Sequence, residues 1–107
     1  MPNNYKNAKL DLTTTDATVL YTCPAATTAL VKSILASEDS GNADTITVTI
    51  TDADAAVFSL FKVKAVGANT TVELLTEPLV VQENEILKVT AATANRLHVV
   101  ASLLEIN

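Results

Sequence analysis

The chain has few of the residues from which catalytic sites are built. Its 107 residues include one cysteine, one histidine, two glycines and no tryptophan. A single cysteine excludes an intramolecular disulfide, and two distant glycines, Gly41 and Gly67, exclude a glycine-rich phosphate loop. No serine stands in a G-x-S-x-G sequence. The sequence therefore predicts that the protein is not an enzyme.

The lone cysteine and the lone histidine do not form a recognisable catalytic motif. Cys23 would need His98 as its base, and nothing in the sequence brings the two together. A cysteine without such a partner is usually a small buried apolar side chain. We expect Cys23 to be buried, and we expect His98 to be a packed or interfacial residue.

Basic residues are few and scattered. Seven lysines and arginines stand against twelve acidic residues, which gives a formal net charge of −5. No segment carries the clustered cations with which proteins neutralise nucleic-acid phosphates. The same acidity is unfavourable at an anionic lipid surface. The sequence predicts neither nucleic-acid nor membrane partners.

Long apolar runs are also missing. The first residues, Met-Pro-Asn-Asn-Tyr-Lys, lack the hydrophobic segment of a signal peptide, and no run approaches the roughly 20 apolar residues that span a bilayer. We expect a protein made in the cytoplasm that stays soluble until it meets a partner. Because aromatic residues make up only 4% of the chain, its core must consist of valine, isoleucine, leucine and alanine.

What the chain does contain is a series of short segments rich in β-branched residues. In the clearest, Ile46, Val48 and Ile50 alternate with threonines, as in a half-buried antiparallel strand. Pro24 cannot donate to a strand ladder and should end the second segment. The expected strands are 6–12, 17–22, 27–37, 45–51, 57–66, 70–76, 79–81, 86–91 and 96–106.

These segments recur every 8–12 residues or so, a spacing typical of sandwiches. The sequence predicts an all-β, antiparallel, jelly-roll-like β-sandwich of about eight strands. Residues 13–107 form its single domain, and residues 1–12 are either an N-terminal extended arm or the first strand. Gly67-Ala68-Asn69 suggests a hairpin turn between 57–66 and 70–76, because glycine and asparagine tolerate the backbone of such turns.

The segment 27–37 is ambiguous. Leu30, Val31, Ile34 and Leu35 would fit one face of a helix, whereas a strict period of two places Lys32 beside Ile34. We favour a strand, because nearly every neighbouring segment is one.

Acidic side chains gather in the loops, at Glu38, Asp39, Asp44, Asp52 and Asp54. Their spacing does not match a calcium-binding EF-hand loop. The simpler interpretation is a solvated loop, and a loose calcium site between loops is the alternative. We expect no catalytic residues, no metal and no cofactor.

Three features suggest a surface for protein contacts. A threonine-covered strand face is flat and uncharged, the polar N-terminal segment carries a tyrosine, and the last strand is apolar on both faces. A solvent-facing sheet and a frayed terminus are the simpler interpretations. The interface residues predicted from these features are Tyr5, Leu10, Thr47, Thr49, Leu104 and Ile106.

Residues 20–34 read LYTCPAATTALVKSI. This run resembles small structural proteins of marine tailed bacteriophages, in which a YT-x-P-A-x-x-T-A-x-V-K-S-I stretch precedes an acidic loop and a strand of alternating threonine and valine. Residues 38–44 and 45–51 match that continuation, and the ending ASLLEI fits the family's S-x-x-E-I. The resemblance spans most of the chain, and it implies that Tyr21, Pro24 and Lys32 mark a strand–turn–strand core.

The resemblance implies a β-sandwich virion protein present in many copies, such as a head decoration or cement protein on the capsid exterior. Its partner would be the major capsid protein or another virion protein. It would be a homo-oligomer, and a trimer suits the threefold positions of a shell. The alternatives are a neck, tail or fibre-adaptor component and a carbohydrate-binding attachment module, although the scarcity of aromatic residues disfavours the latter.

Overall fold

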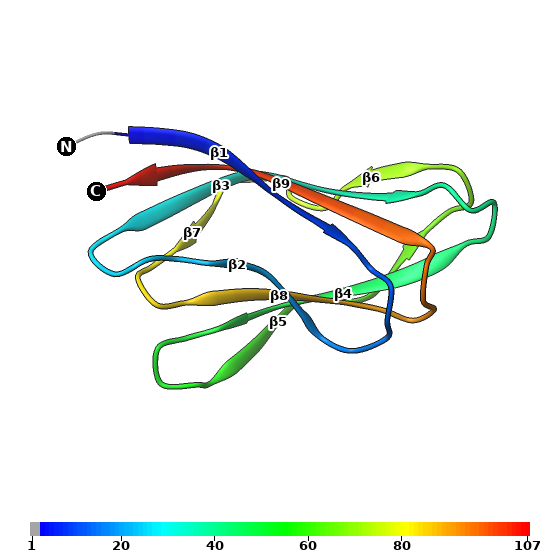
Figure 1. Cartoon of the computed structure of the whole chain (residues 1–107), viewed down its shortest axis with the longest axis horizontal. Coiled ribbons are helices and arrows are strands. Elements are labelled where there is room, and N and C mark those ends of the chain that lie inside the picture. Colours follow the sequence, from blue (N-terminus) through cyan, green and yellow to red (C-terminus); the bar gives the residue numbers. More distant parts are fainter. Residues whose placement is uncertain (1–2) are drawn as a thin grey trace.

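The computed structural model describes residues 3–107 as two antiparallel sheets packed face to face (Figure 1). Residues 1 and 2 of the predicted arm lie outside this range. No helix occurs among the described residues. The strands are β1 (Asn3–Asp11), β2 (Thr18–Thr22), β3 (Thr28–Glu38), β4 (Asp44–Thr51), β5 (Val57–Val66), β6 (Thr71–Glu73), β7 (Leu79–Val81), β8 (Ile86–Ala91) and β9 (Leu97–Ile106).

The first sheet, sheet A, has the order β1-β9-β3-β6, with β7 also paired to β3. The second, sheet B, has the order β2-β8-β4-β5. This architecture confirms the predicted all-β antiparallel sandwich. Asn3 lies opposite Ile106, so the two ends of the described chain lie side by side, as Figure 1 shows.

The core is aliphatic, as the composition requires. Ile46 and Val48 of β4 face it, while Thr47 and Thr49 lie half-buried on the outer face of sheet B. In β9, Leu97, Val99, Ala101 and Leu103 are buried in the same alternating way. Burying these side chains contributes the main stabilising free energy of the fold, on the order of 25 cal/mol per Å² of apolar surface.

Residues 28–38 form a strand, which confirms the preferred interpretation of the ambiguous segment. The pairing of β3 with β9 shifts register between Val31 and Ser33. Such a bulge lets Val31 and Ile34, three residues apart, both point into the core, and leaves Lys32 exposed. This one-residue insertion is why the segment follows no simple period of two.

The predicted hairpin between 57–66 and 70–76 is wrong. β5 belongs to sheet B, whereas β6 pairs with β3 in sheet A, so the turn at 67–70 carries the chain from one sheet to the other. β6 also ends early, at Glu73. The Glu73 carboxylate accepts hydrogen bonds from the Ile34 and Leu75 amides at 2.9 and 3.2 Å, which fixes the turn that follows.

Candidate interaction surface

A buried carboxylate joins the two sheets near the chain ends. Glu105 of β9 is only 6% exposed. It accepts a hydrogen bond from the hydroxyl of Tyr21, across the sandwich on β2, at 2.5 Å. Its other oxygen lies 3.2 Å from the ammonium of Lys6 on β1. One glutamate thus ties β9 to both β1 and β2.

The protonation of this cluster suits a structural role. The hydrogen bond from Tyr21 lowers the pKa of Glu105 against the opposing effect of burial, and Lys6 lowers it further. Burial, and then the hydrogen bond to Glu105, raise the pKa of Tyr21 far above its ordinary value. Near neutral pH the glutamate is therefore charged and the tyrosine neutral. A protonated phenol that donates to a carboxylate gives neither a free base nor a nucleophile.

Glu38, one of the acidic loop residues, is buried at the end of β3 and organises two loops. Its carboxylate accepts hydrogen bonds from the amides of Ser40, Gly41 and Asn69 at 2.8, 3.2 and 3.1 Å, and from the Ser40 hydroxyl. Burial acts to raise the pKa of Glu38, but these donors outweigh it and lower the pKa to about 2. With its oxygens occupied by these donors, Glu38 is a loop anchor.

The other acidic residues do not form a metal site. Asp44 accepts a hydrogen bond from the Thr93 amide, and Asp52 caps the amides of Asp54 and Ala56. Across residues 3–107, no three histidine, cysteine, aspartate or glutamate side chains are placed to hold a metal ion.

Cys23 and His98 lie in different surroundings. Cys23 is fully buried and its thiol donates to the Thr27 carbonyl at 3.3 Å. Burial raises the pKa of Cys23, which disfavours the reactive thiolate. His98 is exposed on β9, 3.3 Å from Asp11 and 3.6 Å from Asp39.

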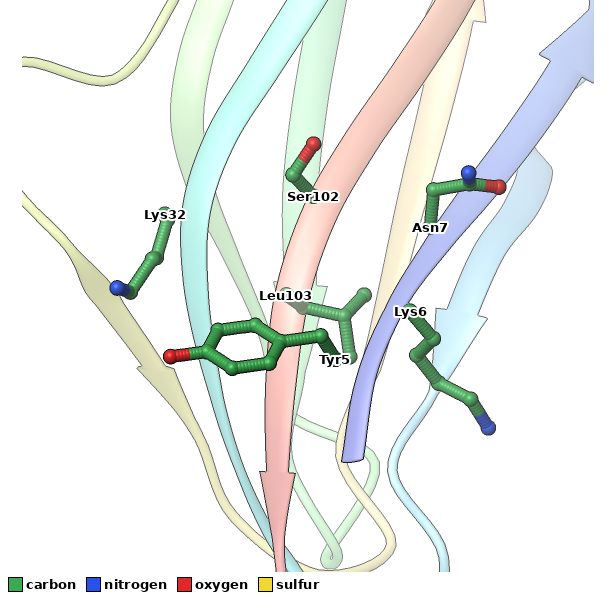
Figure 2. A pocket seen from close by; sticks show the side chains of 6 residues that line it. All are labelled: Tyr5, Lys6, Asn7, Lys32, Ser102 and Leu103. Carbon is green, nitrogen blue, oxygen red and sulfur yellow. The ribbon is translucent and has the colours of Figure 1, made fainter. Parts of the chain in front are cut away.

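An open groove of about 320 Å³ lies on the outer face of sheet A. In Figure 2 the Tyr5 ring extends from β1 across β9 toward Lys32 on β3. The Lys32 ammonium lies 5.6 Å from the ring centroid, a cation–π distance. Asn7 and Ser102 add polar side chains to the rim. The tyrosine is 74% exposed and is the largest apolar side chain presented by β1.

The six residues predicted as an interface do not form one patch. Tyr5 pairs with Leu104 across β1 and β9, and Ile106 follows on the same face at the chain end. Leu10 instead packs against the core. Thr47 and Thr49 lie on the other sheet, and the Thr47 hydroxyl already accepts the Val63 amide at 3.0 Å. Three of the six therefore gather on sheet A beside the groove.

The sequence interpretation missed a second exposed apolar group, on β5. Val57, Phe58 and Val63 are 62%, 54% and 61% exposed. Val63 has a backbone φ of 54°, an unusual conformation for a β-branched residue. The mixed pattern of apolar residues on both sides of 57–66 was the signal, but the sequence does not show that this strand lies at the edge of a sheet.

Comparison with solved structures shows a similarity of fold. No family model and no curated protein matches the chain. A solved structure from a study of Bacillus endospore appendages, described there as a family of disulfide-linked pili, superposes with a TM-score of 0.57. It shares 9% sequence identity, and the match covers 97% of this chain and 84% of that one. At this identity the similarity shows a common fold.

No helix that could span a bilayer is present in residues 3–107.

Proposed function

We propose that this protein is a non-enzymatic structural subunit that works in many copies within a larger particle. The observation that carries the proposal is the exposure of large apolar side chains on sheet strands, on β1 at Tyr5 and on β5 at Val57, Phe58 and Val63. The buried polar clusters of the protein support the proposal as well, because Glu38, Glu73 and Glu105 hold strands and loops in place.

More specifically, we propose that the protein decorates the exterior of a bacteriophage capsid and bridges capsid subunits. The resemblance of residues 20–51 and of the C-terminal ASLLEI to small phage virion proteins supports this assignment. A protein that binds only the assembled shell stabilises it by mass action, because each bound copy favours the assembled state. It would be made in the host cytoplasm and act on the virion.

A second candidate is a subunit of a fibre or appendage, which the shared fold with an appendage pilus protein favours. That protein is described as disulfide-linked. Here the lone cysteine, Cys23, is fully buried, so it is not available for a disulfide between folded copies. A fibre of this protein would be held by non-covalent contacts between strands.

Copy number in purified virions tests the proposal. Quantitative mass spectrometry should find a fixed ratio of this protein to the major capsid protein, with hundreds of copies per particle, and antibodies should label the head. A ratio of a few copies per virion with label at the neck or tail would contradict capsid decoration. Label on extended filaments would support the second candidate instead.

A further inference from the structure

The four sheet edges of this sandwich are not equally protected against pairing with another chain. Natural proteins block exposed edges with short strands, proline, bulges and lysines. On one side of sheet A, β6 and β7 are three residues each and are separated by Pro78. On sheet B, β2 is five residues long with a register shift after Val19.

The long edge strand β5 is blocked as well. Its pairing with β4 shifts register twice, and Val63 takes up a positive φ between Lys62 and Lys64. A bulge flanked by lysines is poorly suited to accept another strand. Its exposed apolar side chains therefore suit side-chain contacts better than a continuation of the sheet.

β1 is long, contains no proline and has no register shift. It carries two lysines, of which Lys6 is paired with the buried Glu105 and Lys9 is left without such a partner among the described residues. The nine residues of β1 pair with β9 in one continuous register, from Asn3 opposite Ile106 to Asp11 opposite His98. Within residues 3–107, no strand pairs with the other edge of β1. This edge is the longest regular one that the fold leaves open.

Only every second residue of β1 bonds to β9, and the backbone groups of the others point to the open edge of the sheet. The Leu12 amide donates to the Leu97 carbonyl at 3.0 Å, in the same register as the ladder that precedes it. Because bonded pairs alternate in an antiparallel ladder, the even-numbered residues of β1 bond to β9. The odd-numbered residues direct their N–H and C=O groups to the open edge: Asn3, Tyr5, Asn7, Lys9 and Asp11.

We propose that β1 of one copy pairs antiparallel with β1 of a second copy, about a twofold axis at Asn7. This register uses all nine residues and joins the outward-pointing groups of both strands. It places Tyr5 opposite Lys9 and Asn3 opposite Asp11, so no like charges face each other. The Asn3–Asp11 amide–carboxylate pair, which symmetry repeats, is favourable, while the Tyr5 ring stays turned toward Lys32 of its own copy.

The second copy is thus the occupant that fits this edge in charge and length. The pairing would join two copies of sheet A into one continuous sheet and bring both grooves of Tyr5 and Lys32 to the same outer face. Figure 2 shows the groove of one copy. An interface formed by one strand edge is small, so we expect a weak dimer with a Kd on the order of 10 µM or above. The inference deepens the proposed structural role and replaces the trimer suggested by the resemblance with a dimer.

The substitution Asn7→Pro should weaken the dimer without destabilising the monomer. Asn7→Pro removes an outward N–H and no bond to β9, and an edge strand tolerates such a proline. Sedimentation velocity over a concentration series up to about 1 mM measures the Kd of the dimer. We expect the Kd of Asn7→Pro to be at least about tenfold higher than that of the unchanged protein. Asn7→Ala keeps the outward N–H and should change the Kd by less than about threefold. Equal far-UV circular dichroism spectra would show that both variants fold.

Cysteine cross-linking tests the register. Two residues at the twofold axis have Cα atoms about 5.5 Å apart in a bonded antiparallel pair, within the range of a disulfide. Asn7→Cys should therefore form an intermolecular disulfide under mild oxidation, whereas Lys9→Cys, which faces Tyr5, should not. The buried Cys23 does not interfere.

A monomer at every concentration would overturn the inference, as would cross-linking of Lys9→Cys as readily as Asn7→Cys. These results are distinct from failure of the proposed function. A protein that never dimerises but binds capsids would refute the β1 contact alone. A β1 dimer that binds no particle would refute the structural role alone.

Discussion

At the scale of single residues, the Tyr21–Glu105–Lys6 cluster stabilises the sandwich at the end where the chain begins and ends. Glu105 follows the alternation of apolar core positions in β9, so its place in the sequence already put a carboxylate on the buried face. The partner could not be predicted, because Tyr21 is 84 positions away and on the other sheet.

Removing the Tyr21 hydroxyl should therefore destabilise the protein. Tyr21→Phe leaves one oxygen of a buried carboxylate without its donor, and we expect the free energy of unfolding to fall by about 1–3 kcal/mol. Urea denaturation measures the change. Tyr5→Phe, at an exposed tyrosine, is the matched control and should change stability by less than about 0.5 kcal/mol. Equal effects of the two substitutions would contradict the assigned role of Glu105.

Glu38 predicts a dependence of stability on pH. Its pKa is about 2 in the folded protein, against an ordinary value of 4.5, so the unfolded chain binds the proton more readily. The stability that Glu38 contributes is fully present above pH 4.5 and is lost as the pH falls toward 2. Glu73 and Glu105, whose pKa values are also lowered, act in the same direction.

Thermal unfolding between pH 2 and 7 tests this account. The melting temperature of the unchanged protein should decrease as the pH falls below 4.5, and that decrease should be smaller in Glu38→Gln. Asp54→Asn, at an exposed acidic loop residue, is the control and should retain the full decrease. Parallel curves for the unchanged protein and Glu38→Gln would show that Glu38 does not titrate as described.

At the scale of elements, strand positions were predictable and pairing was not. The segments 57–66, 79–81 and 86–91 have the expected bounds, because β-branched runs between polar turns mark a strand locally. Which strand pairs with which depends on contacts far apart in sequence. The false hairpin at 67–69 shows this: Asn69 adopts the positive φ of a tight turn, but Glu38 holds its amide so that the chain crosses to the other sheet.

Bulges are the second feature that the sequence pattern does not reveal. The bulge in β3 shifts the alternation of inward and outward side chains between Val31 and Ile34. The bulge in β5 leaves Val63 in a left-handed conformation. A β-branched side chain is strained there, by about 1–2 kcal/mol. The strain is a local property of the strand and can be relieved without altering the core.

Val63→Gly should therefore raise stability, by up to about 1 kcal/mol, because glycine adopts the positive φ freely and the lost side chain is exposed. The measurement is the free energy of unfolding in urea. Val57→Gly replaces an equally exposed valine in the same strand at a residue without a positive φ, and should be neutral or destabilising. If Val63→Gly destabilised the protein as much as Val57→Gly, the strain at Val63 would be ruled out.

At the scale of the whole molecule, the all-β sandwich was predictable, because short β-branched segments separated by polar turns recur along the whole chain. The candidate interaction surface followed only in part. Tyr5, Leu104 and Ile106 do lie together on sheet A, whereas Thr47 and Thr49 belong to the opposite layer. Edges and exposed faces arise from strand order, which no local pattern encodes.

The capsid role that we propose is tested most directly by co-sedimentation of the purified protein with expanded, empty capsids of a tailed phage that encodes such a protein. Bound copies are counted per shell across a titration. We expect binding to saturate at a fixed ratio to the major capsid protein, together with a higher melting temperature of the shell. Absence of the protein from the pelleted capsids at saturating concentration would contradict capsid decoration.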